Sequence, residues 1–150
     1  KLNKKLKTLS KNKLSSLMSI SDDLAALNYD RNQNWKIPFT KKNAKQAIVI
    51  DSTNLRAYYI YASNDFHTPS KYGGGKEAEK YLLKAISFPS QKVKNEYLPS
   101  WGKEQAYEML IKLYIKKEKW ELAKKYYQEG IKEFPKSYTI NQLASKLVGK

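Results

Sequence analysis

The chain has 150 residues, a formal net charge of +15 and no cysteine. Without cysteine, neither a disulfide framework nor a zinc-ribbon site can form. No apolar run approaches the roughly 18 residues that a membrane-spanning helix needs. Its length and its 41% hydrophobic content suit one compact domain with a core.

The first twenty residues combine a leucine stripe with a dense positive charge. Five leucines lie roughly on one side of a predicted helix over residues 1–20, which contains no acidic residue. Six lysines accompany them: Lys1, Lys4, Lys5, Lys7, Lys11 and Lys13. Such a helix suits an anionic surface, so peripheral membrane contact stays open. The missing initiator methionine is consistent with a leader removed before Lys1.

Nucleic acid is disfavoured as a partner by the kind of basic residue present. Of the 29 basic residues, only Arg31 and Arg56 are arginines. Recognition of bases and phosphates favours the planar guanidinium, which forms paired hydrogen bonds, over the lysine ammonium group. Most lysines are also spread along the chain, as expected for a solvated surface.

Three helical pairs are predicted after residue 20. The first covers residues 21–54, with Leu24 and Leu27 on one helix and Ala44 and Ala47 on the next. The segment 50–54 ends with Ser, Thr and Asn, which accept hydrogen bonds from free backbone N–H groups. We therefore expect one helix to end and another to begin there.

The second pair covers residues 55–103 and contains two insertions rich in turn residues. Apolar and small residues recur at helical spacing in both helices. Those of the first helix are Tyr58, Tyr61 and Ala62, and those of the second are Ala78, Leu82 and Ala85. The segment 64–75 holds a proline and three consecutive glycines, and the segment after Ala85 holds further Pro and Ser, so both are predicted loops.

The third pair, residues 104–137, has the clearest pattern. The first helix contains Ala106, Tyr107, Leu110, Ile111, Leu113 and Tyr114, and the second contains Leu122, Ala123, Tyr126, Tyr127, Gly130, Ile131 and Phe134. Pro135 is expected to stop the second helix. Ala123 and Gly130 are expected where the two helices cross, because a larger side chain would push the helices apart. Residues 138–150 are predicted as a capping helix with Leu143 and Leu147 buried.

The spacing of Tyr107, Leu110, Tyr114, Ala123, Tyr127, Gly130 and Pro135 resembles one tetratricopeptide repeat. The resemblance extends over about residues 21–137 and implies an all-α superhelix, a solenoid of about three helical hairpins. The segments 54–59, 68–69, 72–76 and 99–104 are also similar to small exported tetratricopeptide proteins of Gram-negative bacteria. That likeness implies a periplasmic or cell-envelope location and a role in assembly.

Residues that could carry chemistry have ordinary structural explanations. His67 is the single histidine and has no second histidine or cysteine for a metal site. The run from Gly73 to Lys76 lacks the spacing of a phosphate-binding loop and reads as a tight turn. Carboxylate pairs such as Glu77 with Glu79, or Glu118 with Glu121, lie among lysines and suit surface ion pairs. We therefore predict no enzymatic activity, no cofactor and no metal.

A binding surface for a protein or peptide is predicted instead. The resemblance implies that the first helix of each pair lines a concave face. Aromatic and arginine side chains on such a face are typical of protein interfaces. The partner-binding residues predicted there are Tyr29, Arg56, Tyr59, Ser63, Phe66, Glu108 and Lys112. The function predicted is a protein-binding scaffold or adaptor, a subunit or accessory factor of a larger assembly, which binds its partner through the concave face or the loop over residues 64–75. The alternative is electrostatic binding of nucleic acid or anionic lipid by the N-terminal helix.

Overall fold

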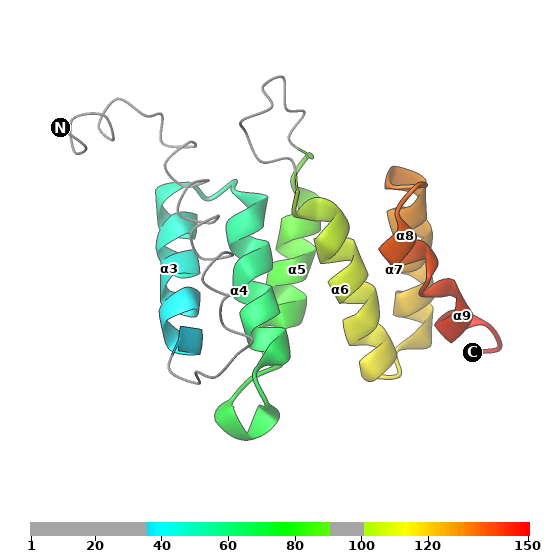
Figure 1. Cartoon of the computed structure of the whole chain (residues 1–150), viewed down its shortest axis with the longest axis horizontal. Helices are drawn as coiled ribbons and strands as arrows, with labels where there is room; N and C mark the ends of the chain where they lie inside the picture. The colour runs from blue at the N-terminus through cyan, green and yellow to red at the C-terminus, as the bar shows by residue number, and fades with distance from the viewer. Residues whose placement is uncertain (1–35, 91–100) are drawn as a thin grey trace.

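The computed structural model describes residues 36–90 and 101–150, with side chains from residue 41 onward in the first range. Within these ranges the chain is helical and contains no strand, which confirms the predicted all-α class for this part. The helices follow one another along the long axis of the molecule (Figure 1). They are α3 (Lys36–Ile50), α4 (Leu55–His67), the 3-10 turn η2 (Ser70–Tyr72), α5 (Ala78–Ser87), α6 (Lys103–Lys116), α7 (Trp120–Glu133), α8 (Tyr138–Asn141) and α9 (Ala144–Leu147).

The boundary between α3 and α4 lies where the sequence predicted it. Helix α3 ends at Ile50, and the Asp51 side chain accepts hydrogen bonds from the backbone N–H and hydroxyl of Thr53, at 2.9 and 2.7 Å. The Asn54 side chain then accepts the Arg56 N–H at 3.1 Å and caps α4. Both side chains satisfy donors that the turn leaves without helical partners.

The connection between α4 and α5 depends on glycine. Gly73 and Gly75 adopt φ angles of +85° and +79°, which L side chains rarely adopt. A Cβ atom on Gly74 would lie 2.0 Å from the Thr68 carbonyl oxygen. The predicted tight turn is therefore confirmed. The loop is shorter than the predicted segment 64–75, because α4 continues to His67.

The core lies between α4, α5, α6 and α7, which pack in sequence against one another. Its fully buried members include Ala62, Leu82, Leu110 and Ala123. Burial of one such leucine stabilises the fold by about 1.5–3 kcal/mol. The two helices of each of the pairs α4–α5 and α6–α7 coincide with the predicted ones, because their apolar residues recur at helical spacing.

Gly130 lies at the contact that the sequence predicted, but there is more room than expected. A Cβ atom there would meet Ile140 Cδ1 at 3.4 Å and Tyr107 Cβ at 3.5 Å, which is ordinary contact. A single methyl group therefore fits between α7, α6 and α8, so the prediction that any larger side chain would separate the helices is wrong for alanine.

The predicted capping helix over 138–150 is also corrected. The segment forms two short helices, α8 and α9, separated by a turn at residues 142–143. The Ser137 hydroxyl accepts the Ile140 N–H at 3.2 Å and starts α8. The Leu143 N–H then donates to the Ile140 carbonyl at 2.9 Å, closing a tighter turn than an α-helix has. Leu143 and Leu147 are buried as predicted.

The helix predicted over 1–20 and the first half of the predicted unit 21–54 lie outside the described residues. The proposed division of the chain at residues 20, 54, 103 and 137 stays a prediction.

Candidate functional site

Helices α4 and α6 meet along their lengths, although α5 separates them in the sequence. Near their N-terminal ends, the rings of Tyr59 and Trp101 lie edge to face with centroids 6.0 Å apart. Near their C-terminal ends, the Lys116 ammonium nitrogen lies 5.5 Å from the centre of the Phe66 ring. The two helices therefore run in the same direction beside each other, with like ends together.

Five of the predicted binding residues lie on these two helices with their side chains at least partly accessible. Tyr59, Ser63, Phe66 and Glu108 are half-buried, and Lys112 is exposed. Lys112 and Glu108 form an ion pair one turn apart on α6. We call this set the α4/α6 face: Tyr59, Ser63, Phe66, Glu108 and Lys112. The helices bring its members onto neighbouring surfaces, whereas Tyr29 lies outside the described residues.

Arg56 is not at the accessible position that the sequence predicted. It is only 1% exposed, so its side chain is not available to a partner. Burial lowers the pKa of its guanidinium, an effect partly offset by the nearby Asp51 carboxylate. The physical reason for the burial is the start of α6. Gly102 approaches so closely that a Cβ there would lie 2.9 Å from Arg56 Cγ and 2.6 Å from Leu55 Cδ1.

A cluster of four polar side chains joins α3, α4 and the start of α5. We call it the polar cluster: Lys41, Tyr61, Asp65 and Glu77. The Asp65 carboxylate is 1% exposed and accepts the backbone N–H groups of Glu77 and Ala78, each at 2.9 Å. Lys41 Nζ lies 3.0 Å from the other Asp65 oxygen. Asp65 thus caps α5 from α4, where a negative charge favours the helix N-terminus.

The rest of the polar cluster surrounds the buried Tyr61. The Tyr61 hydroxyl donates to the Glu77 carboxylate, which also lies 3.3 Å from Lys41 Nζ. The ammonium nitrogens of Lys41 and Lys45 lie 4.7 and 5.4 Å from the centre of the Tyr61 ring. The Tyr81 ring stacks on the Tyr61 ring, with the two centroids 3.9 Å apart. Lys41 of α3 therefore links two carboxylates and an aromatic ring that belong to α4 and the start of α5.

The electrostatics of the polar cluster favour structure over acid–base chemistry. Burial alone would raise the pKa of Asp65, but hydrogen bonds from the Glu77 N–H, Lys41 and the Ala78 N–H lower it overall. Burial opposes the charge on Lys41, yet Asp65 and Glu77 raise its pKa. Burial and the Glu77 hydrogen bond raise the pKa of Tyr61. Each shift moves the pKa of the group further from pH 7, whereas a general acid or base works best with a pKa near the working pH.

The remaining candidate groups also have structural surroundings. His67 is exposed, with Nδ1 2.8 Å from the Ser63 carbonyl oxygen one turn earlier. Glu79 lies 2.9 Å from Lys117 and 3.7 Å from Lys119, and accepts the Tyr114 hydroxyl at 3.2 Å. The predicted ion pairing of Glu77 and Glu79 is confirmed, but their partners lie on α3 and in the turn after α6. They are not the neighbouring lysines of α5.

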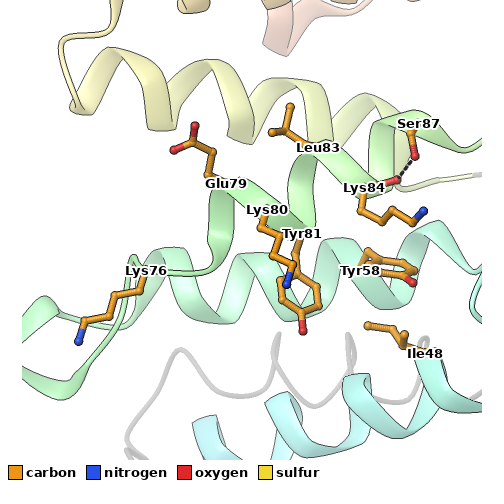
Figure 2. A pocket seen from close by; sticks show the side chains of 9 residues that line it. All are labelled: Ile48, Tyr58, Lys76, Glu79, Lys80, Tyr81, Leu83, Lys84 and Ser87. Carbon is orange, nitrogen blue, oxygen red and sulfur yellow. Dashed lines mark hydrogen bonds between the residues drawn. The ribbon is translucent and has the colours of Figure 1, made fainter.

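A groove of about 910 Å³ runs along α5 and is the second candidate surface. We call it the α5 groove. Figure 2 shows Lys80, Tyr81, Tyr58 and Ile48 toward the α3 side of α5, and Glu79 and Leu83 toward α6. Its lining residues are Ile48, Tyr58, Lys76, Glu79, Lys80, Tyr81, Leu83, Lys84 and Ser87. The sequence reasoning missed this groove and the role of Asp65. The regular spacing of Lys76, Lys80 and Lys84 was the signal that could have indicated the groove.

Metal-binding groups and membrane-spanning helices are the remaining features to consider in the described residues. Residues 36–90 and 101–150 contain no group of three or more His, Asp or Glu side chains placed to hold a metal ion. No helix within the same ranges has the length and apolar character needed to cross a bilayer.

Comparison with known proteins gives matches at the start of the chain. The family model of peroxide stress protein YaaA matches residues 1–58. A UPF0246 protein of Teredinibacter turnerae is 59% identical over 64 residues, which cover 41% of this chain and 25% of that protein. A UPF0246 protein of Flavobacterium johnsoniae is 55% identical over 63 residues, with 39% and 25% covered. No solved structure matches the chain.

These findings overturn the tetratricopeptide resemblance. The matched family is that of peroxide stress protein YaaA, and the matching curated proteins are UPF0246 proteins. The recognition of a tetratricopeptide protein is therefore wrong, and the envelope location that it implied stays an untested prediction. The matched residues 1–58 end within the first turn of α4, so α5 to α9 lie beyond them. The chain spans about a quarter of the length of these curated relatives.

Proposed function

We propose that the chain is a non-enzymatic scaffold that binds a protein partner on the α4/α6 face. The observation that carries this proposal is the parallel contact of α4 and α6, which gathers five predicted binding residues from two separate segments. Support also comes from the mixture of aromatic, polar and charged groups there, which is the composition of many protein interfaces. A short stack of helical hairpins, an α-solenoid, is the arrangement that we propose for presenting this face.

The absence of catalytic activity is part of the same proposal. It is supported by the polar cluster, in which the resolved pKa shifts keep Asp65 and Lys41 charged and Tyr61 neutral around pH 7. Glu79 is likewise held ionised, because Lys117 lowers its pKa. Groups held in one protonation state stabilise the helix junctions but do not exchange protons readily at neutral pH.

The test uses charge changes that leave the core untouched. Ser63→Glu with Lys112→Glu makes the face, on which the charges of Glu108 and Lys112 cancel, strongly negative, and breaks an exposed ion pair that contributes about 0.3–0.5 kcal/mol. The matched control is Lys132→Glu with Lys146→Gln, which lowers the net charge equally at exposed positions of α7 and α9. We expect a partner recovered on the immobilised wild-type chain to be recovered on the control and lost on the face variant. Equal recovery on both variants would refute this binding face.

A second candidate arises from the family match over residues 1–58. That family is the one of peroxide stress protein YaaA, and we propose a role in peroxide stress as the alternative for this segment. Because the chain has no cysteine, such a role would not use thiol oxidation by the chain itself. The measurement is survival of a deletion strain in peroxide with and without this chain; unchanged survival would remove the candidate.

Electrostatic binding by the lysines of residues 1–20 remains the third proposal. It predicts retention on a polyanion that falls steeply between about 50 and 200 mM salt. A failure to bind a polyanion at low salt would eliminate it.

A further inference from the structure

The α5 groove carries three lysines at a regular interval along one side. Lys80 and Lys84 are one helical turn apart on α5, and Lys76 precedes the helix on the same rim. Alternate residues of an extended peptide are separated by roughly 6.5 Å, and residues four apart on a helix by about 6 Å. The attachment points of Lys80 and Lys84 on α5 are therefore spaced like side chains that repeat along a polypeptide, and Lys76 adds a third positive charge from the segment before the helix.

This positive charge is not compensated within the described part of the chain. No carboxylate of residues 41–90 or 101–150 forms an ion pair with Lys76, Lys80 or Lys84. Glu79 also lines the groove, but its oxygens are held by Lys117, Lys119 and the Tyr114 hydroxyl. It points away from the lysine rim, toward α6 (Figure 2). The rim is thus complementary to a negatively charged ligand.

Beneath the lysines the groove is apolar and aromatic. Tyr58 and Tyr81 have ring centroids 5.9 Å apart, and Tyr58 and Phe88 are 5.5 Å apart. One face of Tyr81 stacks on Tyr61. These rings already pack against one another, so they do not form the free stacking platform that single-stranded nucleic acid uses. Ile48 and Leu83 add aliphatic surface that suits the side chains of a polypeptide.

We propose that the α5 groove binds an acidic segment of a partner polypeptide, with carboxylates on Lys76, Lys80 and Lys84 and apolar side chains against Ile48, Tyr58 and Tyr81. This site lies beyond the proposed function, since it shares no residue with the α4/α6 face. The two surfaces can therefore be tested separately.

The experiment measures fluorescence anisotropy of labelled twelve-residue peptides added to the full chain. The probe repeats Glu-Glu-Leu, and two comparison peptides repeat Gln-Gln-Leu and Glu-Glu-Ser. We expect the first peptide to bind tightest, because only it supplies both carboxylates and apolar side chains. Removal of the three charges by Lys76→Gln, Lys80→Gln and Lys84→Gln should weaken its binding about tenfold, a modest factor for each exposed ion pair.

The matched control removes three other exposed lysines, by Lys132→Gln, Lys136→Gln and Lys146→Gln. It lowers the net charge equally and should leave peptide binding within about twofold of wild type, as should the Ser63→Glu, Lys112→Glu variant. Equal weakening by the control would reduce the effect to general electrostatics and overturn the site. Tighter binding of a twelve-nucleotide oligothymidine than of the acidic peptide would overturn the assignment to a polypeptide. Equal affinity for the Glu-Glu-Leu and Glu-Glu-Ser peptides would refute the proposed contact of apolar side chains with Ile48, Tyr58 and Tyr81.

Discussion

Replacement of Asp65 by alanine should destabilise the helical stack strongly. The change removes the acceptor of two buried backbone N–H groups and one ammonium group, at 2.9, 2.9 and 3.0 Å. Loss of a helix cap costs about 1 kcal/mol, and breaking a fully buried ion pair costs about 3–5 kcal/mol. Lys41 is partly exposed and can turn toward water, so the second cost applies only in part. We expect a loss of about 2–4 kcal/mol in the free energy of unfolding.

The same variant carries a pH signature. The folded-state pKa of Asp65 lies below its ordinary value of 3.8. Its contribution to stability is therefore fully present above about pH 5 and is lost as the pH falls through the lower folded-state pKa. The difference in stability between wild type and Asp65→Ala should accordingly shrink in acid.

Urea denaturation followed by circular dichroism, at pH 7 and at pH 3, measures both effects. Glu121→Gln is the control, because Glu121 is exposed on α7 and its ion pair with Lys124 should contribute less than about 0.5 kcal/mol. A loss below about 0.5 kcal/mol for Asp65→Ala at pH 7 would refute the capping role. A wild-type advantage that does not decrease in acid would refute the electrostatic part of the reasoning.

Three further predictions concern close packing and alkaline pH. Gly74→Ala should destabilise the chain by about 1–3 kcal/mol in thermal unfolding, because its Cβ would overlap the Thr68 carbonyl; a midpoint equal to that of wild type would contradict this. Gly130→Ala should raise stability by about 0.5–1 kcal/mol through helix propensity, whereas Gly130→Leu should lower it by about 1–3 kcal/mol; destabilisation by alanine would show that no space exists beside Tyr107. Burial, with the charges of Glu133 and Glu129, raises the pKa of Tyr107 to about 12, so its stabilisation should decline from about pH 10 upward. The free energy of unfolding of wild type should thus fall relative to that of Tyr107→Phe between pH 10 and 12. A difference between the two proteins that stays constant over this pH range would exclude the effect.

The helices α6 and α7 could be predicted from the sequence because their signals are local. Buried residues such as Leu110, Tyr114 and Ala123 recur at helical spacing, and Pro135 follows the last turn. The turn at Gly73 and Gly75 was equally predictable, since it requires positive φ angles, which glycine adopts readily. Local periodicity did not identify the family, however, because many unrelated helical hairpins share the same spacing of apolar and small residues.

The site residues were harder to predict because they depend on contacts between distant segments. Asp65 has no signal within its own helix, because its partners Lys41 and Ala78 lie 24 and 13 residues away. Arg56 looked like a surface anchor, and its burial follows from the approach of Gly102. Neither arrangement follows from the spacing of residues within one helix.

The central claim is that the α4/α6 face receives a protein partner, and hydrogen–deuterium exchange of the complex recovered on the wild-type chain tests it most directly. The account predicts slower exchange in peptides from residues 55–67 and 103–116 when the partner is bound, with residues 120–133 unchanged. Protection confined to α7, α8 and α9, with α4 and α6 exchanging as in the free chain, would contradict it.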